Sequence, residues 1–122
     1  ATHAASTLDW SEPTREGHAA LLRWYRELLA LRAHEPGLRG AAAGGATPPL
    51  RCHITEGDAG TPLTVRLTRP GWTVAVNLSD RRQRVEVPES SSVRLLWPDA
   101  PAASVADGSV HLSRGASAVL RS

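Results

Sequence analysis

Twelve carboxyl side chains are the groups of this chain most capable of acid and base chemistry. Hydrolysis of a glycosidic bond, for example, needs two carboxyl groups held about 5 to 9.5 Å apart on a rigid scaffold. Most of the twelve fall in turns or at solvent-facing positions of expected strands; they are Asp9, Glu12, Glu16, Glu27, Glu35, Glu56, Asp58, Asp80, Glu86, Glu89, Asp99 and Asp107. We therefore expect no catalytic pair among them.

The five histidines and the single cysteine lack the spacing of a metal site. Zinc enzymes often carry two histidines four residues apart on a helix, and no such pair occurs among His3, His18, His34, His53 and His111. Cys52 and His53 are neighbours, so they point to opposite faces of an expected strand. We predict no metal ion, and the absence of a glycine-rich phosphate loop before a helix predicts no other cofactor.

Trp72 and Trp97 are the residues best suited to contact a sugar, because an aromatic ring can lie flat on the face of a pyranose. Each of them, however, alternates with apolar residues such as Val74 and Leu95. That pattern favours packing in a core, and sugar contact is the second interpretation of both tryptophans.

Charge and composition exclude several classes of partner. The formal net charge is +2, and the basic residues are all arginines spread along the chain rather than clustered, which is unlike a nucleic-acid surface. No apolar run approaches the roughly 20 residues of a membrane span, and no secretory leader pattern is present. A single cysteine suits a reducing compartment. We expect no nucleic acid, no membrane and a cytoplasmic location.

The first part of the chain contains one amphipathic segment. Apolar residues recur at helical spacing from Leu21 to Leu31, and Pro36-Gly37 ends the run. We predict a helix over residues 14–34, with Thr14 as its N-cap. Its apolar residues spread over about half of the circumference, which is more than one sheet normally covers. The helix is therefore expected to pack on two sides, against the following β unit and against a partner.

Four helix residues are the candidates for that domain interface: Trp24, Tyr25, Leu28 and Arg32. The first three supply apolar area. Arg32 lies within the apolar stripe, where it either extends to solvent from the helix end or forms an ion pair across the boundary.

After a linker rich in Gly, Ala and Pro, the alternation period becomes two. Short apolar runs recur near residues 50–54, 63–67, 72–78, 85–87, 93–97, 105, 110–112 and 116–120, with turn residues between them. We predict a mainly β fold, an antiparallel β-sandwich of about seven strands preceded by one amphipathic α-helix. The expected organisation is an approach segment and helix in residues 1–37, a linker in 38–49 and the sandwich in 50–122.

Several segments together resemble the C-terminal region of glycoside hydrolases of the α-amylase family. The last helix of the catalytic barrel in that family is similar to Leu8-Asp9-Trp10-Ser11-Glu12-Pro13, His18 and Leu22-x-Trp24-Tyr25-Arg26-x-Leu28-x-Ala30-Leu31-Arg32. The β domain that follows the barrel is similar to Thr73-Val74-Ala75-Val76-Asn77-Leu78-Ser79-Asp80-Arg81 and Ala116-Ser117-Ala118-Val119-Leu120.

The resemblance implies that the chain is one part of a larger enzyme. Enzymes of this family have a (β/α)8 catalytic barrel whose catalytic carboxylates lie upstream of the final helix, so no catalytic residue can be assigned here. The trehalose-releasing members hydrolyse the α-1,4 glucosidic bond next to the terminal trehalose of malto-oligosyltrehalose. The missing partner of the helix would be the barrel, and without it the chain is expected to self-associate.

Three functions follow for the chain itself. The first is a non-catalytic accessory domain that packs on the barrel through the helix. The second is an α-glucan-binding module that holds malto-oligosaccharide on exposed aromatic side chains. The third is a small independent enzyme. The absence of a recognisable catalytic constellation favours the first.

Overall fold

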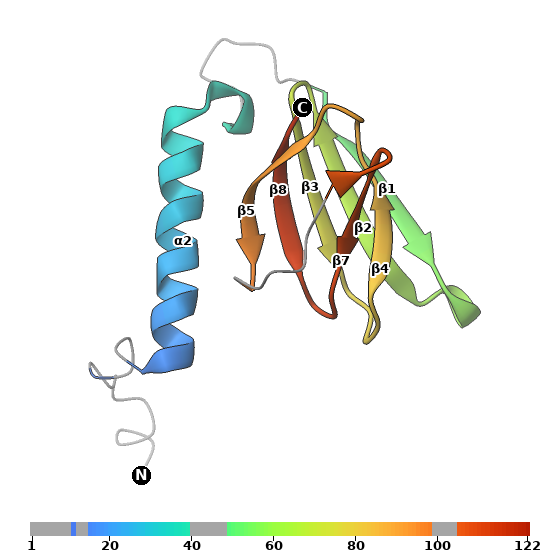
Figure 1. Cartoon of the computed structure of the whole chain (residues 1–122), viewed down its shortest axis with the longest axis horizontal. Coiled ribbons are helices and arrows are strands. Elements are labelled where there is room, and N and C mark those ends of the chain that lie inside the picture. Colours follow the sequence, from blue (N-terminus) through green and yellow to red (C-terminus); the bar gives the residue numbers. More distant parts are fainter. Residues whose placement is uncertain (1–10, 12–14, 40–48, 99–104) are drawn as a thin grey trace.

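The computed structural model describes residues 11, 15–39, 49–98 and 105–122. Within them, one α-helix precedes two antiparallel β-sheets (Figure 1). The elements are α2 (Glu16–His34), η2 (Pro36–Leu38), β1 (Arg51–Glu56), η3 (Asp58–Gly60), β2 (Pro62–Arg69), β3 (Trp72–Asn77), β4 (Gln83–Glu86), β5 (Ser92–Trp97), β6 (Val105–Ala106), β7 (Ser109–Leu112) and β8 (Ser117–Arg121).

The predicted helix is present, and its ends follow from its sequence. It begins at Glu16 after an N-cap at Arg15 that makes no side-chain capping bond, while the predicted N-cap, Thr14, lies outside the described residues. An acidic side chain in the first turn suits the helix dipole. At the other end the Glu35 amide donates to the Leu31 carbonyl, and Pro36 then starts the 3-10 turn η2 because proline cannot continue the helical hydrogen bonding.

The strands form a sandwich of two sheets, which confirms the predicted mainly β fold. The larger sheet has the order β1-β2-β3-β8-β5, and the smaller one has the order β4-β7-β6. Strand β8 lies between β3 and β5, so the larger sheet depends on pairing between strands that are far apart in the sequence. Eight strands are described instead of about seven, the additional one being the two-residue β6.

Two turns form where the sequence predicts them. Arg69 pairs with Trp72, and the two residues between them form the β2–β3 turn, with Gly71 at a φ of 80°. Asp107 and Gly108 connect β6 and β7 with φ values of 51° and 68°, the left-handed backbone that a type I′ hairpin turn requires. These turns set the register of the strands on either side of them.

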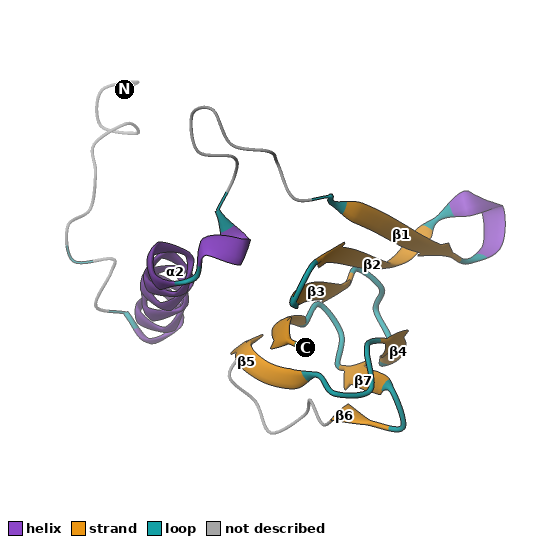
Figure 2. Cartoon of the chain, turned by 90° about the horizontal axis from the view of Figure 1, so that it is seen from above, coloured by secondary structure: helices purple, strands orange, loops and turns teal. Residues whose placement is uncertain are grey.

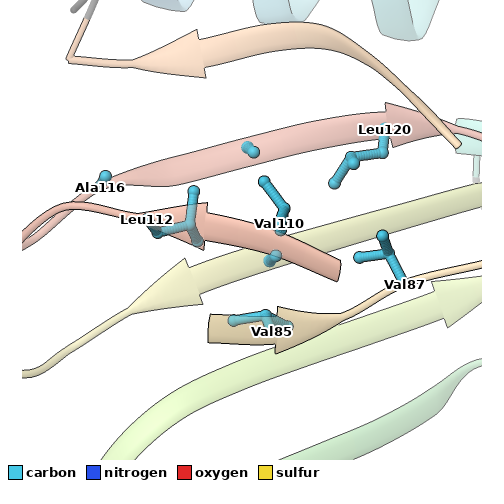
Figure 3. Close-up of a cluster of buried hydrophobic side chains, with 8 residues drawn as sticks. Val85, Val87, Val110, Leu112, Ala116 and Leu120 are labelled. Carbon is cyan, nitrogen blue, oxygen red and sulfur yellow. The ribbon is translucent and has the colours of Figure 1, made fainter. Parts of the chain in front are cut away.

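The buried core lies between the two sheets. Figure 3 shows its side chains projecting from both sheets into the shared space. The cluster consists of Ala75, Val85, Val87, Val110, Leu112, Ala116, Ala118 and Leu120. Val110, Leu112 and Leu120 are fully buried, so the small sheet is held against the large one by aliphatic packing.

The apolar residues of β3 lie mainly on the opposite face of the large sheet. Ala75 faces the core, and strand alternation places Thr73 on the same side. Trp72, Val74 and Val76 therefore point away from the small sheet. Trp72 is only 2% exposed, as core packing predicts, but it is outside the core cluster. We call the face that carries Trp72, Val74 and Val76 the outer face.

Asn77 is a fully buried polar residue that connects the two sheets. Its Nδ2 donates to the carbonyls of Leu112 and Ser113, both at 3.0 Å, and to that of Arg81 at 2.7 Å. Its Oδ1 accepts bonds from the amide and the hydroxyl of Ser79. Asn77-Leu78-Ser79 matches the N-glycosylation pattern, but the Asn77 amide is 0% exposed, so the folded chain does not present it for modification.

Replacing Asn77 by Ala should therefore destabilise the chain strongly. The substitution leaves the Leu112 and Ser113 carbonyls without this donor in a buried place, and we expect a loss of about 3 kcal/mol in the free energy of unfolding. Urea unfolding followed by tryptophan fluorescence measures it. Thr61→Ala, at an exposed position, is the control and should stay within about 0.5 kcal/mol of the parent. Equal stabilities of the two variants would contradict this role of Asn77.

Candidate functional site

Helix α2 carries two apolar stripes rather than one. The first contains Ala20, Trp24, Leu28 and Leu31, all of them partly buried. Trp24 contacts Trp97 of β5, with ring centroids 6.0 Å apart and the ring planes tilted by 35°. This stripe packs the helix on the β5 side of the large sheet, with β1 at the sheet's far end (Figure 2).

The second stripe of α2 is exposed. Leu21, Tyr25 and Leu29 are 38%, 56% and 62% exposed. A spacing of four residues places them on one face of the helix. Together they present a row of large apolar side chains to solvent, which is the feature expected of a helix that packs on two sides.

The four predicted interface residues are divided between these surroundings. Trp24 and Leu28 are partly buried in the first stripe, whereas Tyr25 belongs to the exposed second stripe. Arg32, near the helix end, is exposed. Sequence periodicity grouped these residues, but only the packing of Trp24 on Trp97 shows which side of the helix its own β domain takes.

The C-terminal end of α2 is tied to the large sheet by a small cluster around Trp72. The Arg121 guanidinium lies 5.0 Å from the centre of the Trp72 ring, and its Nη1 is 3.7 Å from Glu35 Oε2. A Cβ on Gly37 would lie only 2.9 Å from Trp72 Cδ1, so η2 packs directly on the indole. This cluster explains why Trp72 is buried even though it faces away from the small sheet.

The outer face of the large sheet is apolar across its strands. The register aligns Ile54 with Val65 and Val65 with Val76, and a second row contains Leu67 and Val74. Ile54 is 48% exposed, and the other four are partly exposed. This face and the second stripe of α2 are two apolar surfaces that remain accessible to a partner.

A cavity of about 220 Å³ lies on the outer face near η2. It is lined by Leu38, Leu50, Leu67, Arg69, Trp72 and Val74. Most of these side chains are apolar, so the cavity extends the apolar character of the face toward the helix end.

The carboxylates show no arrangement that would support catalysis. Those on described residues are solvent-exposed except Glu35, which is partly buried and paired with Arg121. Asp9, Glu12 and Asp99 lie outside the described residues. In the part of the chain that the structure describes, no three His, Cys, Asp or Glu side chains lie close enough to hold a metal ion. Among the described residues, no helix has the length and apolar character needed to cross a membrane.

The two tryptophans considered as sugar contacts differ in accessibility. Trp72 is 2% exposed under η2 and Arg121, which leaves almost no ring surface for a ligand. Trp97 is partly exposed and borders a cavity of about 300 Å³ between α2 and β5. Trp24 lines the same cavity, a neighbour that sequence spacing alone does not reveal because the two residues are far apart in the chain.

Comparison of the sequence with known proteins gives one short match. No protein-family model matches the chain. Malto-oligosyltrehalose trehalohydrolase from Arthrobacter ramosus is 61% identical over 36 residues, which is 30% of this chain and 6% of that protein. The match supports the resemblance to the α-amylase family that the helix and strand segments suggested.

Comparison with solved structures shows the same fold within larger enzymes. The trehalulose synthase MutB from Pseudomonas mesoacidophila MX-45 is similar over 80% of this chain with a TM-score of 0.56 and 21% identity. Isomaltulose synthase PalI from Klebsiella sp. LX3 is similar over 90%, with a TM-score of 0.54 and 21% identity. The chain spans only 17% and 18% of the lengths of these two proteins.

The contact between Trp24 and Trp97 can be tested with a double-mutant cycle. We expect a coupling energy of about 1 kcal/mol between Trp24→Ala and Trp97→Ala, since the two rings pack on each other. Urea unfolding followed by circular dichroism measures all four proteins. Leu21→Ala combined with Trp97→Ala is the control cycle, because Leu21 lies in the exposed stripe, and its coupling should be below about 0.5 kcal/mol. Equal coupling in both cycles would refute the assigned side of the helix.

Proposed function

We propose that this chain is a non-catalytic C-terminal accessory domain of a trehalose-releasing glycoside hydrolase of the α-amylase family. In this proposal the parent enzyme is cytoplasmic and hydrolyses the α-1,4 glucosidic bond next to the terminal trehalose of malto-oligosyltrehalose. Residues 1–37 supply the approach segment and the last helix of the catalytic domain, 38–49 the linker, and 50–122 the β domain.

The observation that carries the proposal is the exposed second stripe of α2. Leu21, Tyr25 and Leu29 project large apolar groups from a helix whose other side already packs on β5. Burying apolar area contributes about 25 cal/mol per Å², so a partner that covers this stripe would stabilise both bodies. A (β/α)8 catalytic domain is the partner that the α-amylase-family resemblance supplies.

The proposal gives different roles to the four predicted interface residues, Trp24, Tyr25, Leu28 and Arg32. Trp24 and Leu28 would hold α2 against the β domain, and Tyr25 would enter the catalytic domain. Arg32 is exposed near the helix end, where its guanidinium would pair with a carboxylate of the partner.

A second candidate function is α-glucan binding. It is favoured by the partly exposed ring of Trp97 at the cavity between α2 and β5. Structurally similar proteins such as trehalulose synthase are named after sugars, which is compatible with this function. An accessory domain could also hold substrate, so the two candidates do not exclude each other.

The accessory role predicts that the isolated chain self-associates and binds apolar dyes. The double variant Tyr25→Glu with Leu29→Lys should be less associated, because it replaces two exposed apolar groups by an ion pair four residues apart that is compatible with a helix. Sedimentation velocity at rising concentration measures the association. Arg26→Gln, at another exposed helix position, is the control and should associate like the parent. A chain that stays monomeric at high concentration and binds no dye would contradict the proposed interface.

The same proposal predicts that the chain releases no trehalose from malto-oligosyltrehalose. The reason is that the catalytic carboxylates of the family lie on barrel strands that precede the last helix. Chromatographic detection of trehalose after long incubation tests this, with an active trehalohydrolase as positive control. Turnover by the pure chain would overturn its assignment as non-catalytic.

A further inference from the structure

We infer that the cavity between α2 and β5 is a binding site for a glucosyl unit of an α-1,4-glucan. The inference rests on the second candidate function for its class of ligand and deepens it by assigning the residues that would hold the sugar; it does not depend on the accessory role. The cavity measures about 300 Å³, at the lower end of the range typical of small-molecule sites. That volume suits one or two sugar rings rather than a long chain.

Aromatic surface is the first requirement of a sugar site, and this cavity has it. Trp24 and Trp97 both line it, and both are partly exposed. Their centroids are 6.0 Å apart with a tilt of 35°, so the rings meet at an angle and do not cover each other as a parallel stack would. The C–H face of a pyranose can pack on such a ring surface while its hydroxyl groups point elsewhere.

Hydrogen-bonding groups of both kinds surround the two rings. Arg23 and Glu27 come from α2 and Arg94 from β5, and all three side chains are exposed. A guanidinium only donates and a carboxylate only accepts. Each sugar hydroxyl can do both, so one ring can satisfy charged groups of opposite sign at the same time. A neutral polyol fits this mixture better than an anion would, because Glu27 would repel an anion.

Strand β5 contributes two further features to the cavity, a sheet edge and a bulge. Within the described residues β5 is an edge strand that pairs only with β8, so one side of its backbone has no partner strand there. Its pairing with β8 shifts between Val93 and Leu95, which makes Arg94 the extra residue of a bulge. Bulges redirect side chains and are frequent beside functional sites, and here the bulged residue lines the cavity.

A larger cleft elsewhere in the β domain shows what is specific about this cavity. It measures about 660 Å³ and lies between the β1–β2 hairpin and β4. Its lining includes arginines and carboxylates such as Arg51 and Glu89, and its one ring is the imidazole of His53. It therefore offers charge without an indole face, and it supplies matched control positions for a binding experiment.

Titration of the ¹⁵N-labelled chain with maltotriose, followed by NMR, tests the site. We expect the indole N–H signals of Trp24 and Trp97 to shift with a single saturable isotherm while that of Trp72 stays in place. Glu27→Gln and Arg94→Gln should each weaken association about tenfold through loss of a charged hydrogen bond. Both residues are exposed, so the amide dispersion of each variant should match that of the parent.

Arg51→Gln and Glu89→Gln are the matched controls from the larger cleft, and they should bind maltotriose like the parent. The inference fails if maltotriose moves neither indole signal, if Glu27→Gln and Arg94→Gln bind unchanged, or if the shifts lie at the larger cleft. It also fails if inorganic phosphate shifts the same signals and maltotriose does not, because the cavity would then be an anion site. None of these outcomes bears on self-association through Tyr25 and Leu29, which tests the accessory role separately.

Discussion

An apolar sheet face that the second sheet does not cover is the constraint from which the rest of the structure follows. On the inner face, Ala75 and Leu120 of the large sheet pack against Val110 and Leu112 of the small sheet. The outer face carries Val65, Leu67 and Val74 and stays partly exposed. Burial of apolar area is the main favourable term in folding. An accessible outer face is therefore a reason for the fold to include a helix and, in our proposal, a further domain.

The attachment of α2 depends on the few groups that meet it from the sheet. Near the middle of the helix, Trp24 packs on Trp97, and beyond its end Glu35 pairs with Arg121, which lies over Trp72. Two separated attachments set the direction of the helix. The cavity that we assign to a sugar lies at the first of them, where Ala20, Arg23 and Glu27 surround Trp24. With Trp24 on the sheet side, Leu21, Tyr25 and Leu29 remain exposed, where a partner can reach them.

Much of the architecture could be predicted from local sequence. The helical run that ends at Pro36 and the short strands separated by turn residues were both expected from residue type and spacing. The site was predicted less completely. Trp97 was a candidate for sugar contact, but Trp24 was assigned to a domain interface alone, Glu27 was considered only as one of twelve carboxylates, and Arg94 was not considered. The proximity of Trp24 and Glu27 to Trp97 depends on how the helix packs on β5, which local spacing does not encode.

The sequence by itself determined the periods, the turns and the presence of an apolar surface larger than one core. It did so because side-chain alternation and turn geometry are local properties of the backbone. Only the tertiary structure decided which face of the sheet became the inside. Alternation makes Ala75 and Val74 point to opposite sides, and the second sheet packs on the side of Ala75. The position of that sheet depends on contacts between strands far apart in the chain, including the pairing of β8 with β3 and β5.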